Sequence, residues 1–206
     1  MRIVKLLLFA FLLWTGANAN AALQSRLGGL AVYDTDLNIT WLAEATPSCG
    51  TFCFDWNTAN NYVTSLSVAG ITGWRLPATM PADPSCTLSY SQGSQCTGSE
   101  MGHLFYFELG GLPGNGNWNL FTNLKETDPG SATAHRTGYW SGTSAGDNQY
   151  WDFAFTSGGQ GIATTGYAMG AWAVHDGDVA PPVPEPTSWA MLLAGLAALG
   201  WVARRR

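Results

Sequence analysis

Short apolar segments separated by polar turns mark the predicted elements in the first third of the chain. Two short apolar segments, 31–34 and 39–42, flank a polar turn, and this pattern predicts a β-hairpin. Asp55 then precedes one apolar stripe at helical spacing, so we expect a helix that Asp55 caps. The stripe consists of Trp56, Ala59, Val63 and Leu66. Residues 74–76 predict a short strand that Pro77 ends.

The pattern changes in the middle of the chain and again near its end. Residues 78–98 predict a long polar loop, and Ser99 and Glu100 open a second predicted helix that reaches Leu109. Apolar and aromatic residues then favour short strands. These strands are expected at 137–141, 149–155 and 167–174. Two helices and several antiparallel strands predict an α+β domain.

Both termini carry apolar segments with basic residues beside them. At the start, basic residues precede the apolar segment 6–14 and an Ala-x-Ala site at 17–19. This order predicts a signal peptide, residues 1–19, that signal peptidase removes; an uncleaved anchor is the alternative. At the end, the 15 apolar residues 189–203 precede Arg204, Arg205 and Arg206. A helix of this length spans about 22 Å, short of the ~30 Å hydrocarbon core. A permanent C-terminal anchor is one interpretation.

Charge narrows the range of partners. Only 11% of residues are charged, against about 25% in ordinary globular domains. Residues 20–188 contain four basic and fourteen acidic residues, a net charge of −10. Such a surface repels phosphate backbones, so nucleic acid is not expected as a partner. Neutral sugars, cations and proteins remain open.

The four cysteines all lie in the segment expected to be exported. An even number of cysteines after a signal peptide predicts disulfides. Three pairings are possible, and we favour the local one, Cys49–Cys53 with Cys86–Cys96. The spacings do not fit a zinc site, and the Cys-x-x-Cys motif of redox proteins is absent.

Several acidic residues are candidates for a metal site. Asp34 and Asp36 alternate as calcium ligands do, although they also suit a hairpin turn. Asp176 and Asp178 are looser oxygen ligands. Glu100 and His103 have helical spacing for a metal, with a capping Glu and an exposed His as the alternative. We expect no cofactor, and calcium is the ion that these acidic residues leave open.

Aromatic residues supply a candidate ligand surface. Flat aromatic rings stack on the C–H faces of sugars. Trp118, Trp140 and Trp172 lie near loops and could serve this role; the alternative is that they fill the core. Arg75 is the lone charge in an apolar segment and is expected to pair with a buried acid. No nucleophile, metalloprotease or phosphate-loop motif is present, so an enzyme is not expected.

The C-terminal segment resembles the PEP-CTERM sorting signal of exopolysaccharide-producing Gram-negative bacteria. The resemblance rests on Val183, Pro184, Glu185 and Pro186, then the short apolar segment, then the arginine cluster. It implies that an exosortase in the inner membrane cuts near the Pro-Glu-Pro sequence. The protein would then associate with that membrane transiently and end at the envelope surface or in the extracellular matrix.

The core resembles the DUF1566, or Lcl C-terminal, family over about residues 30–178. Its most specific segment is Gly73-Trp74-Arg75-Leu76-Pro77. The resemblance is also carried by segments 33–34, 39–42, 56–66, 99–104, 139–143 and 171–174. It implies a C-type-lectin-like fold and export, and it implies no activity. The insertion that holds Cys86 and Cys96 departs from the family pattern.

The expected organisation follows from these patterns. A signal peptide, 1–19, precedes a DUF1566/Lcl-like domain, 20–178, and a Pro-rich linker, 179–188, leads to the apolar helix and arginine cluster, 189–206. We expect an exported, non-catalytic envelope or matrix protein that binds exopolysaccharide. A purely structural, self-associating surface protein is the alternative.

Overall fold

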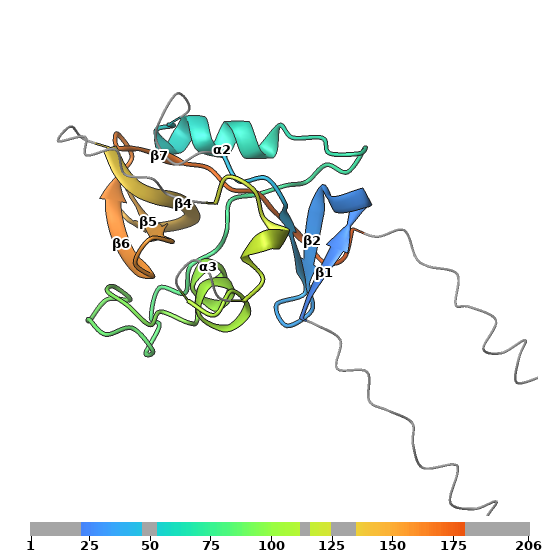
Figure 1. Ribbon diagram of the computed structural model, residues 1–206. Coiled ribbons are helices and arrows are strands. Elements are labelled where there is room, and N and C mark those ends of the chain that lie inside the picture. Colours follow the sequence, from blue (N-terminus) through green and yellow to red (C-terminus); the bar gives the residue numbers. More distant parts are fainter. Residues whose placement is uncertain (1–21, 47–52, 112–115, 125–134, 180–206) are drawn as a thin grey trace, which may run out of the picture.

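The computed structural model describes residues 22–46, 53–111, 116–124 and 135–179. Two four-stranded sheets stand side by side, with helix α3 between them at one edge and helix α2 across the other (Figure 1). The described residues therefore form an α+β fold, as the sequence predicts. The signal peptide (1–19) and the sorting segment (183–206) lie outside them, and so does Cys49.

The first sheet contains the predicted hairpin. Its order is β1-β2-β3-β8, and every pairing is antiparallel. The strands are β1 (Leu23–Arg26), β2 (Ala31–Asp34), β3 (Ile39–Leu42) and β8 (Val174–Asp176), and the short 3-10 helix η1 (Leu27–Gly29) joins the first two. At the tip of the β2–β3 hairpin, Asp34 Oδ1 accepts the backbone N–H groups of Asp36 and Leu37, at 3.0 and 3.1 Å. This local pattern explains why an acid stands at the turn.

The second sheet has the order β6-β5-β4-β7, and its β4–β7 pair is parallel. The strands are β4 (His135–Gly146), β5 (Gln149–Ala154), β6 (Gly159–Thr164) and β7 (Ala168–Gly170). The single strand predicted at 167–174 is wrong. That segment leaves the second sheet after Gly170 and enters the first sheet at Val174. Strand β6 was not predicted, because its small and polar residues lack an apolar alternation.

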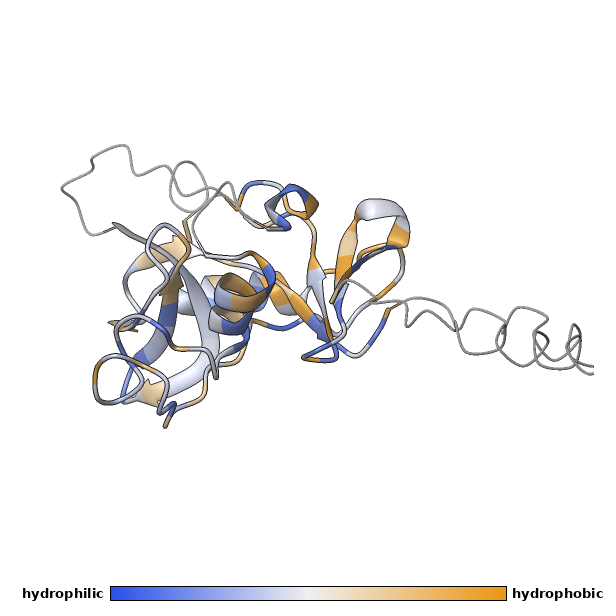
Figure 2. Cartoon of the chain, turned by 60° about the horizontal axis from the view of Figure 1, so that its bottom comes forward, coloured by the Kyte–Doolittle hydropathy of each residue, from blue (hydrophilic) through white to orange (hydrophobic). Residues whose placement is uncertain are grey.

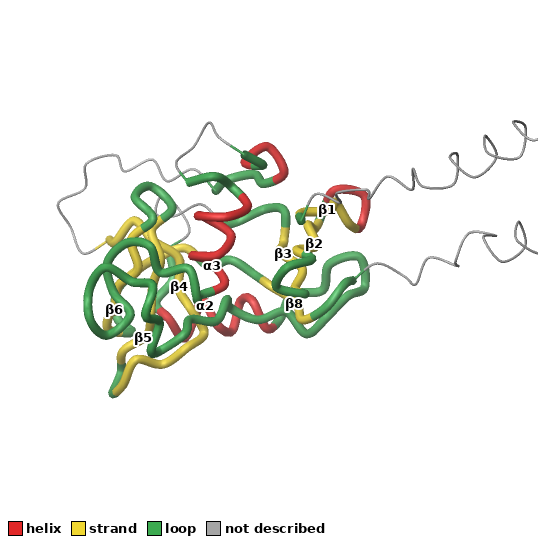
Figure 3. Tube along the Cα trace, turned by 90° about the horizontal axis from the view of Figure 1, so that it is seen from below, coloured by secondary structure: helices red, strands yellow, loops and turns green. Residues whose placement is uncertain are grey.

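Both predicted helices are present. Helix α2 (Trp56–Thr64) buries Ala59 and Val63, and Asp55 caps it by accepting the Thr58 N–H at 2.9 Å. Helix α3 (Glu100–His103) begins at Ser99, which caps it, and continues as a π-helical turn, η2 (Leu104–Glu108). Figure 3 shows the α3–η2 segment in the middle of the molecule, between the two sheets. A 3-10 turn, η3 (Trp118–Leu120), follows. The strand predicted at 74–76 is reduced to one bridge, Arg75 with Val174.

Aromatic rings are the largest side chains of the core. One buried cluster joins both sheets to the α3–η2 segment, and in it the rings of Trp41 and Trp172 lie 4.6 Å apart. A second cluster packs α2 against Trp74 and Trp140. Hydrophobic and hydrophilic residues are interspersed along the strands and helices of the described part of the chain (Figure 2). No helix within the described part of the chain is long and apolar enough to cross a membrane.

Arg75 connects three distant segments. Its guanidinium donates to both carboxylate oxygens of Glu100, at 2.9 and 2.7 Å, and to Asp176 Oδ1, at 2.9 and 2.6 Å. The Glu100 side chain is mostly buried and also accepts the Ala78 N–H at 2.7 Å. These carboxylates raise the pKa of Arg75. The predicted pairing of Arg75 with a buried acid is confirmed.

We expect Arg75→Met to lower the free energy of unfolding by about 2–4 kcal/mol, because it leaves the buried Glu100 carboxylate without its partner. Arg26→Met is the comparison, since the acid it leaves behind, Asp178, is 32% exposed against 16% for Glu100, and we expect a loss below about 1 kcal/mol. Urea denaturation measures both values. Equal losses in the two variants would contradict a special role for Arg75.

Candidate functional site

The structure does not expose the three residues of the predicted ligand surface, Trp118, Trp140 and Trp172, on one open face. Trp140 and Trp172 are 0% and 1% exposed. Their indole N–H groups donate to the backbone oxygens of Phe54 and Leu42, at 2.8 and 2.7 Å. The prediction is wrong for these two residues. A ring whose apolar face is buried and whose N–H is hydrogen-bonded inside the protein belongs to the core. Trp118 is half-buried and packs edge-on against Phe105 and Phe155.

A different aromatic residue is exposed. Tyr90, in the long insertion before α3, is 83% exposed and stands at the rim of a hollow of about 280 Å³. The hollow is lined by Pro81, Tyr90, Gln92, Ser144, Ala145, Trp151 and Ile162. Trp151 is only 3% exposed, and its indole N–H has no hydrogen-bond partner. The hollow thus combines one open ring, polar side chains from two segments and a buried donor.

The insertion is held firmly against the second sheet. Cys86 and Cys96 form a disulfide, as predicted. Gly93 exchanges two backbone hydrogen bonds with Gln160 in β6, at 2.9 and 2.7 Å, and the Gln160 side-chain amide donates to Ser91 O at 2.7 Å. Cys53 is also disulfide-bonded, while Cys49, its predicted partner, lies outside the described residues. The Tyr90 segment is therefore a covalently closed loop docked on a sheet edge.

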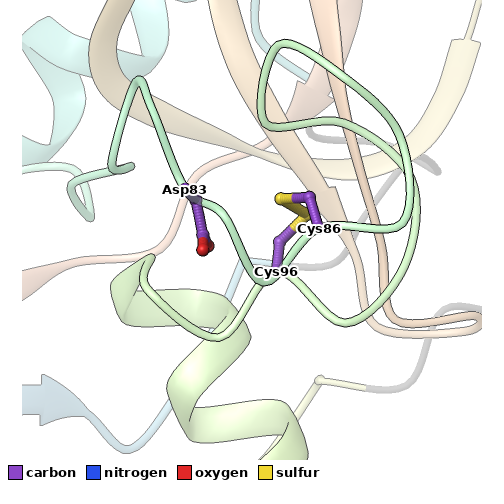
Figure 4. Close-up of side chains that lie close together, drawn as sticks. All are labelled: Asp83, Cys86 and Cys96. Carbon is purple, nitrogen blue, oxygen red and sulfur yellow. A yellow bond between two sulfur atoms is a disulfide. The ribbon is translucent and has the colours of Figure 1, made fainter.

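Asp83 lies close to the Cys86–Cys96 disulfide (Figure 4). Disulfide sulfurs are not thiolates, and thiolates are the form in which cysteine binds metals. Asp83 instead accepts the backbone N–H groups of Ser85 and Gly98, at 2.9 and 2.8 Å. Its role is to shape the loop, and this group is not a metal site.

A second cluster gathers three side chains from separate elements. Asp34, His103 and Glu108 each offer a ligand atom, and these atoms all lie within 4.8 Å of one another. Asp34 is fully buried, and the side chains of His103 and Glu108 are 18% and 7% exposed. His103 Nε2 lies 3.7 Å from Glu108 Oε1. Two carboxylates and an imidazole therefore face one another out of water.

The electrostatics of this cluster are unusual. Burial, and after it the nearby carboxylates of Asp34 and Asp36, together raise the pKa of Glu108 to about 7. Burial also raises the pKa of Asp34, although its two backbone hydrogen bonds and the neighbouring His103 oppose that shift. The carboxylates of Asp34, Asp36 and Glu108 lie close together, and their mutual repulsion disfavours the ionised form of Glu108.

The predicted metal ligands are distributed differently from the expectation. Asp34 is in the buried cluster and Asp36 is exposed beside it, but Asp176 and Asp178 are elsewhere and bind Arg75 and Arg26. Their ion pairs do not bring Asp176 and Asp178 to the cluster, and a calcium site at these two residues stays a prediction. Glu100 does not join His103, because it binds Arg75. The alternative of a solvent-facing His103 is also wrong.

Sequence reasoning missed Glu108 and Tyr90. Glu108 stands in an otherwise apolar segment, between Phe107 and Leu109, and an acid in such a place is a signal of burial. Tyr90 lies in a polar loop with no periodicity, so the sequence holds no sign of its exposure.

One comparison with known proteins finds a match. A model described as the PEP-CTERM protein-sorting motif matches residues 182–206. The chain carries a PEP-CTERM sorting signal. This signal implies processing by an exosortase-type enzyme and export to the envelope or extracellular surface of a Gram-negative bacterium. Comparisons with curated proteins and with solved structures found no match, and the resemblance of the core to the DUF1566 family stays a prediction.

The raised pKa of Glu108 predicts that the free energy of unfolding, measured with a metal chelator present, depends on pH. Below about pH 4.5, Glu108 is protonated in both the folded and the unfolded protein. Between about pH 4.5 and 7 the unfolded protein releases this proton more readily, so the free energy of unfolding falls as the pH rises through about 7. At pH 8 we expect Glu108→Gln to raise the free energy of unfolding by about 2–3 kcal/mol, with almost no effect at pH 4.5.

Denaturant unfolding at the two pH values measures this difference. Glu44→Gln is the control, because Glu44 is exposed and hydrogen-bonds only Asn123 in the described structure. A Glu108→Gln effect of the same size at both pH values would contradict the raised pKa.

Proposed function

We propose that this protein is an exported, non-catalytic component of the cell envelope or extracellular matrix, and that its core binds exopolysaccharide. The sorting signal at 182–206 supports the location. The hollow beside Tyr90 supports the binding, and it is the observation that carries this part of the proposal.

The chemistry of the hollow suits a neutral sugar chain. The exposed Tyr90 ring offers a flat apolar face for the C–H groups of a pyranose. Gln92 and Ser144 supply an amide and a hydroxyl for sugar hydroxyls. The net charge of −10 over residues 20–188 opposes polyanionic chains. At about 280 Å³ the hollow is at the small end of ligand pockets, so it suits a short stretch of a long polymer.

The disulfide supports binding by reducing its entropic cost. A free loop would have to be ordered each time a sugar bound. The Cys86–Cys96 bond and the Gly93–Gln160 hydrogen bonds hold this loop in place beforehand. Polymer binding also allows several weak sites on neighbouring proteins to act together.

The proposed route starts with removal of the predicted signal peptide by signal peptidase. The protein is then held transiently at the inner membrane by the apolar segment 189–203, until the exosortase cuts near Pro184–Pro186. The folded core leaves toward the envelope surface or the matrix.

Sugar binding is tested with the exported protein and exopolysaccharide from a producing strain. We expect saturable binding, weakened about tenfold by Tyr90→Ala, which corresponds to about 1.4 kcal/mol of lost stacking. Tyr62→Ala is the matched control, since Tyr62 is a partly exposed tyrosine on helix α2. Calorimetry measures the affinities, and circular dichroism confirms folding.

Unchanged affinity in Tyr90→Ala would contradict this location of the binding site. Absence of binding by the unaltered protein would contradict the polysaccharide proposal. Concentration-dependent assembly, seen by sedimentation velocity in that case, would favour the self-associating structural alternative.

Processing is tested by the intact mass of the exported protein. We expect a chain that has lost the residues after the Pro-Glu-Pro sequence, and we expect Pro184→Ala to leave the segment 187–206 attached. Pro181→Ala is the control, because Pro181 precedes the matched motif. A full-length mass for the unaltered exported protein would contradict cleavage.

A further inference from the structure

We propose that Asp34, His103 and Glu108 bind one divalent transition-metal ion. The inference is independent of the sugar-binding site, which lies in a different segment of the chain. It rests on four observations about the cluster: its spacing, its unpartnered atoms, the helix geometry that builds it and the absence of an arginine or lysine beside it among the described residues.

The spacing is close to that of a coordination shell. Ligand atoms about 2.1 Å from one ion lie no more than about 4.2 Å from one another. His103 Nε2 and Glu108 Oε1 are 3.7 Å apart, which already satisfies this limit. The whole set lies within 4.8 Å, so movements of less than ~1 Å close it.

Two of the atoms are buried without a hydrogen-bond partner. These are Asp34 Oδ2 and His103 Nε2. Buried polar atoms normally have partners, because leaving one without costs about 1–3 kcal/mol. The other Asp34 oxygen accepts two backbone N–H groups, which orient the carboxylate in the way that outer-shell hydrogen bonds orient metal ligands. A metal ion would satisfy both unpartnered atoms at once.

The π-helical turn is what brings Glu108 to His103. The Leu109 N–H donates to Leu104 O at 2.9 Å, five residues back, instead of the four of an α-helix. His103 keeps the contact with Phe107 that helical spacing gives it, with the ring centroids 5.0 Å apart and the rings edge-on. The wider turn places residue 108 beside residue 103. Such turns are rare and occur frequently at functional sites.

No described arginine or lysine neutralises the carboxylates of the cluster, which leaves His103 as the one basic side chain beside them within the described residues. The two arginines whose side chains the structure describes, Arg26 and Arg75, bind Asp178, and Glu100 with Asp176. Burial first, and then the neighbouring carboxylates, raise the pKa of Glu108. A divalent ion supplies the missing positive charge.

The donor set indicates which ions fit. Calcium and magnesium prefer six or more oxygen ligands, whereas this cluster offers an imidazole nitrogen and two carboxylates. Imidazole with carboxylate suits zinc, manganese, iron and related ions. Three protein donors leave at least one position for water or another ligand. We therefore propose a transition metal here instead of the calcium ion considered from the sequence. Asp34 is the one residue that belongs to both the predicted calcium ligands and this cluster.

The test uses untagged full-length protein stripped with a chelator and then titrated with Zn²⁺, Mn²⁺ or Ca²⁺ alone at pH 7.5. We expect one Zn²⁺ or Mn²⁺ per chain by elemental analysis, micromolar affinity by calorimetry and a higher melting temperature. His103→Gln should weaken binding at least tenfold, whereas His175→Gln, a histidine in β8 outside the cluster, should not.

Glu108→Gln keeps the test decisive if other variants fold poorly. Without metal this variant is expected to be more stable than the unaltered protein, yet it should lose most of the rise in melting temperature that Zn²⁺ produces. The proposal is overturned if the stripped, folded protein binds neither Zn²⁺ nor Mn²⁺, if Ca²⁺ binds more tightly than both, or if His103→Gln and Glu108→Gln bind as tightly as the unaltered protein.

Discussion

The guanidinium of Arg75 fixes the position of the central helix. The backbone of Arg75 pairs with Val174 at the start of β8, while its side chain binds Glu100, the first residue of α3, and Asp176 at the end of β8. The start of α3 is thereby attached to the first sheet. Because the helix is short, its attachment at Glu100 also determines where His103 and Glu108 lie relative to Asp34, at the tip of that sheet. The buried ion pair thus sets the geometry of the acidic cluster although it is not part of it.

A second constraint acts from the opposite side of α3. Gly102 passes directly against the backbone carbonyl of Cys96, where a Cβ atom would overlap the oxygen. The disulfide loop and α3 are therefore packed at backbone distance, and the Tyr106 hydroxyl adds hydrogen bonds to Gln95 N and Gly158 O. The Tyr90 hollow and the Asp34 cluster stand on two sides of one rigid unit, although they share no residue.

Local features of the structure were predictable from the sequence. The hairpin, the Asp55 and Ser99 caps and the Cys86–Cys96 pairing each depend on residues close together in the chain. Features that depend on distant contacts were not. Trp140 and Trp172 carry the same local pattern whether a ring faces solvent or the core, so only tertiary packing decides their burial. His103 meets Glu108 because of a π-turn, which no hydrophobic periodicity predicts. Asp34 meets both of them through the sheet, from a distant part of the sequence.

The last described residue, Val179, has a consequence for the sorting step. Its side chain is buried in the core, and Asp178 just before it is fastened to Arg26 of β1. Pro184 follows only five residues later. Five extended residues reach about 17 Å, less than the width of a small folded domain. An enzyme that cuts at this short proline motif therefore needs space for the folded core beside its catalytic cleft.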